Sequence, residues 1–283
     1  MIGDVQTGSN CAAPDTFKVY EAWWRQRHAD DQLAWLIGLH DYNALFSALD
    51  TASHFTNSSF GISPDISQVP PSIFPTTSLA FVVSLFPGHN TYLHAGAYDG
   101  GPGDPDDPRG THVILDGDDG IFYALEGGVQ DEGTGTKLGA GAWYRTTNFD
   151  SEFSGQSHED NHGFYLIGET DITDRWAGFF QVGRSDRERN QIGLYAGAGV
   201  TRSDVWAEDD LLGLAVAYAQ NSDNYRDFNP GAEQYEMALE LTYEFHPLPW
   251  LTLQPDLQWI RNPGMNPVLD DALALSLRAY FTF

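Results

Sequence analysis

The chain has 283 residues, of which 40 are acidic and 14 are basic, so its formal net charge is −26. No run of residues approaches the ~18 consecutive apolar residues of a membrane-spanning helix, which excludes a helical membrane protein. The single cysteine, Cys11, excludes a disulfide framework and a cysteine-based metal site, and the excess of acidic residues argues against a basic nucleic-acid-binding surface.

Glycine and aromatic residues favour strands and tight turns over packed helices, since the chain has 29 glycines and is 13% aromatic. Apolar residues recur at every second position in 13 segments, which predicts β-strands. In chain order the predicted strands are 16–27, 32–40, 76–86, 90–98, 120–131, 136–147, 161–171, 175–185, 190–201, 211–222, 231–245, 249–261 and 270–283.

The alternation is clearest over 234–245, where Tyr235 and Leu239 lie on one face and Glu236 and Glu240 lie on the other. These segments are roughly twice the usual ~5–6 residues of a globular strand and near the ~9–11 needed to cross a bilayer at a tilt. The last strand alternates in the same way and ends on Phe283. The pattern predicts an all-β fold, a transmembrane antiparallel β-barrel.

The connections differ in length, as in membrane barrels with tight turns at one end and long external loops at the other. Asp171–Asp174, Ser185–Arg189 and His246–Pro249 are predicted tight turns, whereas 99–119 and 148–160 are predicted external loops. Residues 41–75 have no clear period. A structureless insertion of that length is usually functional, and we expect it to fold into the lumen of a barrel.

Four stretches, in order along the chain, resemble the carbohydrate-selective porins of Gram-negative outer membranes, the OprB-like family. They are Gly3–Asn10 followed by Val19–Trp24; Asn57–Gly61; Tyr98–Pro105 with Gly110–His112; and Leu253–Gln258 through Asn262–Gly264 to Ala272 and Arg278–Tyr280. The resemblance implies a single porin domain over 1–283 and a barrel of about sixteen strands. Since 13 strands are visible, we expect that a signal peptide and roughly three N-terminal strands are absent from this chain.

The resemblance also implies the function, which is passive diffusion of carbohydrates and other small solutes through a water-filled, acidic lumen. Neither a catalytic residue nor a metal ligand or cofactor is expected. The expected partners are small sugars as permeating solutes, outer-membrane lipid and lipopolysaccharide, and the barrel assembly machinery, which would engage the C-terminal strand with Phe283. No nucleic acid is expected, and a homo-oligomer is left open.

A pore for sugars needs hydrogen-bond donors and acceptors, with an aromatic face for the C–H side of the ring. Glu21, Trp23 and Arg25 offer all three on one strand face. Assigning faces to the other strands gives these candidate pore-lining residues: Glu21, Trp23, Arg25, Glu126, Gln181, Glu236, Glu240, Glu244, Gln254, Asp256, Gln258 and Arg278. Leu36, Leu39 and Gln181 stand where the family often carries basic residues, so an acidic lumen is expected to disfavour anionic sugars.

Two alternatives remain open at this stage. A soluble all-β carbohydrate-binding module or glycoside hydrolase would use Glu126 and Glu169 as its acid and base. The acidic residues within 99–119 offer oxygen ligands for Ca²⁺, but they lack the order of an EF-hand loop, so a solvated external loop is favoured. They are Asp99, Asp104, Asp106, Asp107, Asp116, Asp118 and Asp119.

Overall fold

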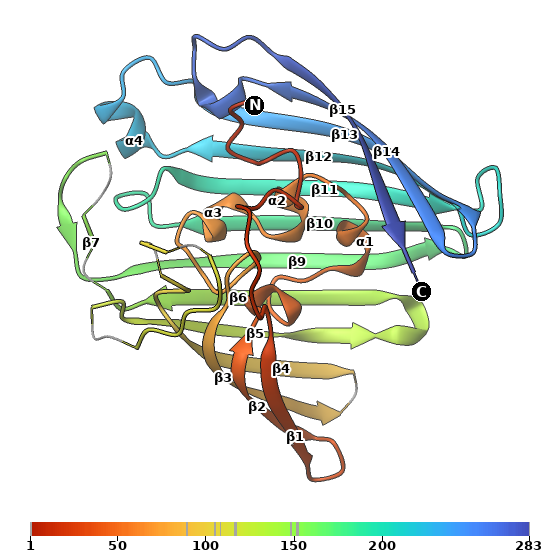
Figure 1. Ribbon diagram of the computed structural model, residues 1–283, viewed down its shortest axis with the longest axis horizontal. Coiled ribbons are helices and arrows are strands. Elements are labelled where there is room, and N and C mark those ends of the chain that lie inside the picture. The colour runs from red at the N-terminus through yellow and green to blue at the C-terminus, as the bar shows by residue number, and fades with distance from the viewer. Residues whose placement is uncertain are drawn as a thin grey trace.

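One large antiparallel sheet of 13 strands forms the body of the protein in a computed structural model (Figure 1). The structure describes residues 2–88, 90–104, 106–107, 109–115, 118–147, 149–150 and 153–282, so Phe283 and Asp116 lie outside it. The strands of the sheet are β1 (Ala22–His28), β2 (Leu33–His40), β3 (Ser78–Gly88), β4 (Thr91–Asp99), β5 (Ile121–Asp131), β6 (Thr136–Arg145), β9 (Asn161–Thr173), β10 (Trp176–Ser185), β11 (Ile192–Ser203), β12 (Leu211–Asn221), β13 (Tyr235–Leu248), β14 (Leu251–Arg261) and β15 (Ala272–Phe281).

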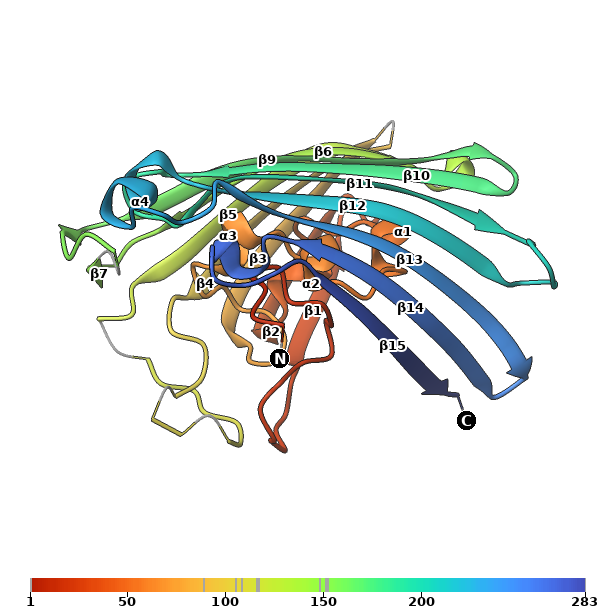
Figure 2. The same ribbon diagram turned by 90° about the horizontal axis from the view of Figure 1, so that it is seen from above.

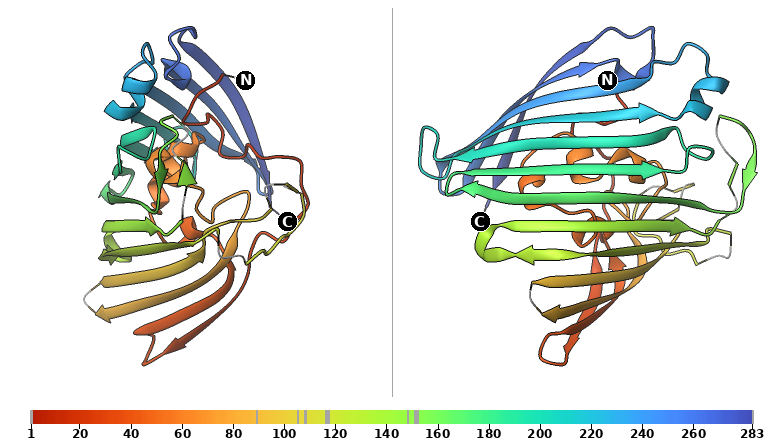
Figure 3. Two further views of the ribbon diagram at one scale, coloured as in Figure 1. Left: turned by 90° about the vertical axis from the view of Figure 1, so that its left-hand side faces the viewer. Right: turned by 180° about the vertical axis from the view of Figure 1, so that it is seen from behind.

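Each strand of the sheet pairs with its neighbours in the chain, and the short pair β7 (Phe149–Asp150) and β8 (Ser157–His158) forms a separate ribbon. The sheet curves into a trough (Figure 3). Among the described residues, the two outermost strands, β1 and β15, pair on one side only. The prediction of an all-β antiparallel fold is confirmed, and the 13 predicted strands correspond to the 13 of this sheet.

The first strand begins at Ala22, so the prediction that it starts at residue 16 is wrong. Residues 5–21, the N-terminal segment, instead run along the concave side of the sheet. The backbone N–H of Asn10 donates to the carbonyl of Thr56 at 2.7 Å, and the hydroxyl of Tyr20 donates to Asp41. Contacts with residues far along the chain therefore replace strand pairing here.

Residues 41–75, the inner segment, connect β2 to β3 and lie within the curve of the sheet (Figure 2). Their short helices are η1 (Tyr42–Ala44), α1 (Asp50–Ser53), α2 (Ser58–Gly61) and α3 (Pro64–Ser67); elsewhere lie η2 (Glu132–Thr134), α4 (Asp223–Phe228) and η3 (Pro263–Met265). In the described part of the chain, no helix is long and apolar enough to cross a membrane. The aromatic rings of Tyr42, Phe46 and Phe60 are buried beneath the sheet.

The two faces of the sheet differ in polarity. On β13, Leu239 and Leu241 point outward with 41% and 44% of their surface exposed, whereas Glu240 between them points inward and is fully buried. A soluble sheet would bury the apolar face instead. The outward apolar face and the polar inner face are the arrangement expected of a membrane barrel wall.

Because successive strands alternate in direction, the connections divide between two ends of the sheet. Those after β1, β3, β5, β9, β11 and β13 lie at what we call the short-turn end, and those after β2, β4, β6, β10, β12 and β14 at the long-loop end. The turns around Asp171–Asp174 and His246–Pro249 are at the short-turn end. The connection around Ser185–Arg189 follows β10 and lies with the long loops, so its prediction as a turn of the other end is wrong.

Glycines on the inner face lie directly opposite aromatic residues of the neighbouring strand. Gly163 pairs with Trp143, and Gly141 pairs with Tyr165. A Cβ at Gly141 would lie 2.2 Å from Cζ of the Tyr165 ring. The absence of a side chain therefore lets the ring lie flat across the adjacent strand, which is a known way to stabilise glycine in sheets.

We expect Gly141→Ala to destabilise the fold by about 1–3 kcal/mol, because its Cβ would force the Tyr165 ring away from the sheet. Thermal unfolding followed by circular dichroism measures the effect. The matched control is Gly178→Ala, where the added Cβ would meet only the end of the Ile172 side chain at 3.2 Å and other atoms beyond that. Equal stability of the two variants would show that the close packing at Gly141 is unimportant.

Candidate solute channel

Carboxylates on the inner face of the sheet hold the inner segment through its backbone. Glu126 on β5 is fully buried and accepts a hydrogen bond from the backbone N–H of Ser47 at 2.7 Å. It also accepts bonds from the hydroxyls of Tyr92 and Tyr165 at 2.8 and 2.7 Å. Lys137 lies 3.6 Å away and balances its charge. Glu126 is thus a buried carboxylate with its hydrogen-bonding capacity satisfied.

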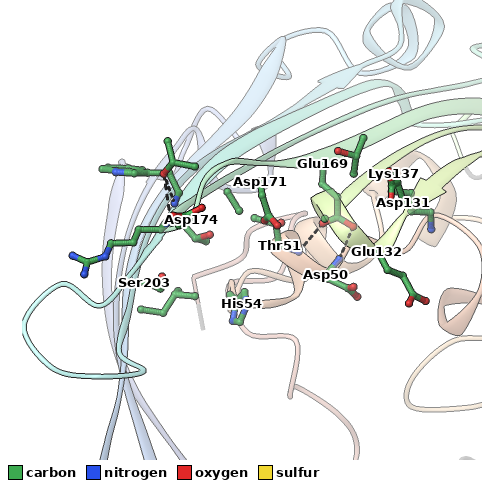
Figure 4. Close-up of a pocket in the computed structure, with 18 of the residues that line it drawn as sticks. Asp50, Thr51, His54, Asp131, Glu132, Lys137, Glu169, Asp171, Asp174 and Ser203 are labelled. Atoms are coloured by element: carbon green, nitrogen blue, oxygen red, sulfur yellow. Dashed lines mark hydrogen bonds between the residues drawn. The ribbon is translucent and has the colours of Figure 1, made fainter.

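Glu169 on β9 caps the start of α1 (Figure 4). It accepts hydrogen bonds from the backbone N–H groups of Asp50 and Thr51 at 3.1 and 2.7 Å. The residue at the N-cap position, Leu49, has no side chain that can do so. The first N–H groups of a helix have no partner within it, and a negative charge there is stabilising. The wall of the sheet supplies the cap that the local sequence lacks.

Glu240 on β13 does the same before α2. It accepts hydrogen bonds from the backbone N–H groups of Thr56 and Asn57 at 2.6 and 2.9 Å. Asn57 is the N-cap residue of α2, and its own side chain accepts the N–H of Ser59. One carboxylate and one amide therefore satisfy consecutive backbone groups of the inner segment.

Glu236, two residues earlier on β13, holds the N-terminal segment. It accepts backbone N–H bonds from Val5 and Gln6, both at 2.9 Å, and from Gly264 at 2.6 Å. Three inward-facing glutamines complete the anchoring by donating from Nε2 to backbone carbonyls. The pairs are Gln181 to Phe60 at 2.9 Å, Gln254 to His54 at 2.7 Å and Gln258 to Gly8 at 2.8 Å.

The other candidate pore-lining residues are less buried or less closely tied to the inner segment. Asp256 is 2% exposed and accepts a bond from Gln258, whereas Arg278 is half-buried and donates to Asn10 of the N-terminal segment. Glu244 lies 3.9 Å from His54 of the inner segment.

Glu21, Trp23 and Arg25 lie at the far edge of the sheet from β13 and β14. Glu21 accepts the backbone N–H of Asp41 at 3.0 Å, and the Trp23 ring is 47% exposed beside His40. The structure therefore does not bring these three together with the carboxylates and amides of β13 and β14 into one cluster.

Three cavities follow the concave side from one end to the other. The central one, of about 410 Å³, lies between the N-terminal segment and the inner segment. A second, of about 440 Å³, lies at the short-turn end, and a third, of about 450 Å³, lies at the long-loop end. Cavities of this size are typical of small-molecule sites.

The central cavity and the cavity at the short-turn end differ in charge. The central cavity is lined by hydroxyl and amide side chains, among them Asn43, Ser53 and Ser58, together with apolar side chains and the carboxylate of Asp41. The cavity at the short-turn end is predominantly acidic, with Lys137 and Arg175 as its cations (Figure 4). Its acidic side chains are Asp50, Asp131, Glu132, Glu169, Asp171 and Asp174.

Asp65 in α3 is a buried carboxyl that no sequence pattern singles out. It is fully buried, and neither of its carboxylate oxygens has a hydrogen-bond partner among the described residues. A Cβ at Gly183 would lie 2.2 Å from Oδ2, so only glycine fits opposite it. Burial raises the pKa of Asp65 to about 7.

Sequence reasoning also missed Glu169, Lys137 and Tyr165 as members of this inner network. Each points inward on its strand, so the same face alternation that identified Glu126 and Glu240 would have found them. Asp65 had no such signal because the inner segment has no regular period.

Comparison with known proteins agrees with the fold. The profile described as "Carbohydrate-selective porin, OprB family" matches residues 2–283. Porin B of Pseudomonas aeruginosa is 22% identical over 335 aligned residues, covering 100% of this chain and 73% of that protein. The high-pH structure of Pseudomonas putida OprB superposes with a TM-score of 0.79 at 20% identity, covering 92% of this chain and 72% of that one.

The outer membrane channel DcaP of Acinetobacter baumannii is a more distant structural match. Its TM-score is 0.60 at 12% identity, over 88% of this chain and 72% of that one. At these identities the solved structures bear on the fold alone, and both are porin barrels of the outer membrane.

We expect Glu169→Gln to loosen the start of α1, because a neutral amide oxygen accepts the two backbone bonds more weakly than a carboxylate. Hydrogen exchange at the amides of Asp50 and Thr51 should accelerate by roughly tenfold. The matched control is Glu132→Gln in the same cavity, which removes an exposed charge outside the inner segment. Unchanged exchange in Glu169→Gln would contradict the anchoring role.

We expect Asp65 to make docking of the inner segment depend on pH. Its pKa of about 7 in the folded protein exceeds the ordinary value of 3.8, so the folded state binds the proton more tightly. The stabilisation is complete below pH 3.8 and is lost as the pH rises to about 7.

The variant Asp65→Asn should remove this contribution and become more stable than the parent at pH 7 and above. Unfolding measured from pH 4 to pH 8 on both proteins tests it, since other carboxylates titrate equally in each. Parallel pH profiles of the two proteins would refute the assignment.

Proposed function

The chain belongs to the OprB family of carbohydrate-selective porins, and on this premise we propose that its inner segment sets the width and polarity of the passage for sugars. Membership of the family assigns the protein to the outer membrane of Gram-negative bacteria. It also makes the protein a channel for small solutes, with carbohydrates crossing by passive diffusion.

The observation that carries the proposal is the set of hydrogen bonds from the sheet to the backbone of the inner segment. Glu126, Glu169 and Glu240 bind it at three places, from Ser47 to Asn57. A segment fixed to the wall at intervals keeps a constant cross-section. Selectivity then follows from pore radius and from the groups that face the solute.

The hydroxyls and amides of the central cavity are suited to neutral sugars. Side chains such as Ser58 and Asn43 can both donate and accept hydrogen bonds, which matches sugar hydroxyls. The contacts are few and individually weak, as a channel requires so that the solute can leave. We therefore assign solute contact to the inner segment and anchoring to most of the candidate pore-lining residues of the sheet.

Glu21, Trp23 and Arg25 keep their proposed contact with solutes. Trp23 and Arg25 lie on the inward face of β1, where no part of the inner segment covers the Trp23 ring completely. A partly exposed indole beside charged groups provides a face for a sugar ring.

The remaining partners follow from the two faces of the sheet. The outward leucines of β13 and β15 are proposed to contact outer-membrane lipid, since Leu239, Leu273 and Leu275 are 41%, 72% and 80% exposed. The C-terminal strand is proposed to engage the barrel assembly machinery. Contact with lipopolysaccharide and formation of a homo-oligomer remain hypotheses.

The alternative of a glycoside hydrolase is not favoured. Its candidate acid and base, Glu126 and Glu169, are both occupied by backbone N–H groups of the inner segment. A carboxylate that is held in this way cannot approach a glycosidic bond. We propose that the protein has no catalytic activity.

We expect reconstituted protein to pass glucose faster than gluconate, because the acidic cavity at the short-turn end repels the anion. The double variant Glu132→Gln with Asp174→Asn should raise the gluconate-to-glucose ratio by about twofold at low salt. Liposome flux assays measure both solutes, and glucose serves as the internal control. Equal rates for the two solutes in the parent protein would contradict an acidic passage.

A further inference from the structure

The cavity at the long-loop end has a composition different from that of the other two. It encloses about 450 Å³ between the end of α3 and the loops that follow β6, β10 and β12. Side chains from four separate parts of the chain converge on it, so it is a product of the folded state. Its polar groups are mainly amides, with the guanidinium groups of Arg145 and Arg189.

Two aromatic rings form one wall of the cavity. Phe153 and Tyr225 meet edge to face with their centroids 5.5 Å apart. Both side chains are half-buried, and no side-chain hydrogen bond within the described residues occupies the Tyr225 hydroxyl. Paired rings of this kind offer an apolar surface edged by a polar group, which suits the C–H face and hydroxyls of a sugar ring.

The amides are held in place by bonds that orient them. Asn161 and Asn190 exchange two side-chain hydrogen bonds of 2.8 Å, and both residues are buried. Gln191 donates to Asn221 at 3.1 Å. The positions of these groups are therefore fixed before a ligand arrives, which reduces the entropy lost on binding.

The charges around the cavity are nearly balanced. Arg189 is paired with Asp160 at 2.8 Å and with Asp186 at 2.5 Å. Arg145 donates to the carbonyl of Gly100 at 2.8 Å and lies near the carboxylates of Asp119 and Asp99, while its buried Nε–H has no hydrogen-bond partner within the described residues. A neutral ligand rich in acceptor oxygens fits this surface better than an anion or a cation.

We propose that this cavity is a capture site for a neutral hexose at the external mouth, separate from the central passage and loaded before the solute enters it. The inference rests on the proposed channel function, which it deepens by placing a sugar-binding site outside the inner segment. Its rings would stack against the sugar, and its amides and Arg145 would donate to the hydroxyls. Binding there raises the local concentration of neutral sugar at the mouth.

The test uses the whole protein, with D-glucose as the probe. Calorimetry on protein in detergent gives the affinity, and flux into liposomes gives the half-saturating concentration. We expect Tyr225→Ala to weaken affinity by about threefold to tenfold and to raise the half-saturating concentration equally. The limiting flux at saturating glucose should stay unchanged, because the central passage is untouched.

Two further variants test whether Tyr225→Ala acts only by disturbing the loops in general. Tyr225→Phe keeps the ring and loses only the hydroxyl, so it should bind glucose more tightly than Tyr225→Ala. Phe228→Ala removes the other ring that contacts Phe153 but does not line the cavity, and it should leave both measurements unchanged. Loss of binding in Phe228→Ala as large as in Tyr225→Ala would overturn the proposal, as would parent-level binding in Tyr225→Ala.

The capture site and the channel can fail independently. Glucose binding that depends on Tyr225 in a protein without glucose flux would sink the channel function and leave the capture site standing. Saturable flux that is the same in the parent and in Tyr225→Ala would sink the capture site alone.

Discussion

The inner segment depends on backbone hydrogen bonds donated to carboxylates of the surrounding sheet. A segment with only short helices that lies within the curve of a sheet must find partners for its remaining N–H groups away from bulk water. Glu169 and Glu240 supply them at the starts of α1 and α2, and Glu236 supplies them for the N-terminal segment. Removing any one of these carboxylates leaves buried donors unsatisfied, which is costlier than losing an ordinary surface bond.

This arrangement explains how so acidic a chain folds around itself. Carboxylates accept but do not donate when ionised, so they match backbone N–H groups without competing for carbonyls. The glutamines at 181, 254 and 258 do the complementary task by donating to carbonyls. Where glycine lies opposite an aromatic residue, as Gly141 does opposite Tyr165, the ring can lie flat against the sheet. The Tyr165 ring lies in this way, and its hydroxyl donates to Glu126. The carboxylates, the glutamine amides and the aromatic rings thus act together to hold the inner segment against the sheet.

The sheet could be predicted from sequence because alternation is a local property. Residues two apart share a face, so the inward position of Glu240 and the outward position of Leu239 follow from their spacing alone. What covers Glu240 does not follow, because its partners Thr56 and Asn57 are more than 180 residues away. The same limit explains the N-terminal segment, where Tyr20 bonds to Asp41 instead of extending a strand, and Asp65, which lies in a stretch without any period.

The distribution of charge along the concave side gives the passage a direction. Amides and paired charges surround the cavity at the long-loop end, hydroxyl, amide and apolar groups line the centre, and carboxylates concentrate at the short-turn end. A neutral sugar meets weak hydrogen-bonding groups throughout and no strong electrostatic barrier. An anion meets rising negative potential as it moves inward, because low-dielectric walls focus the field of the carboxylates. We therefore propose that selection by charge occurs after selection by hydrogen bonding, and that the anchoring carboxylates take little part in it since their charge is already shared with backbone N–H groups.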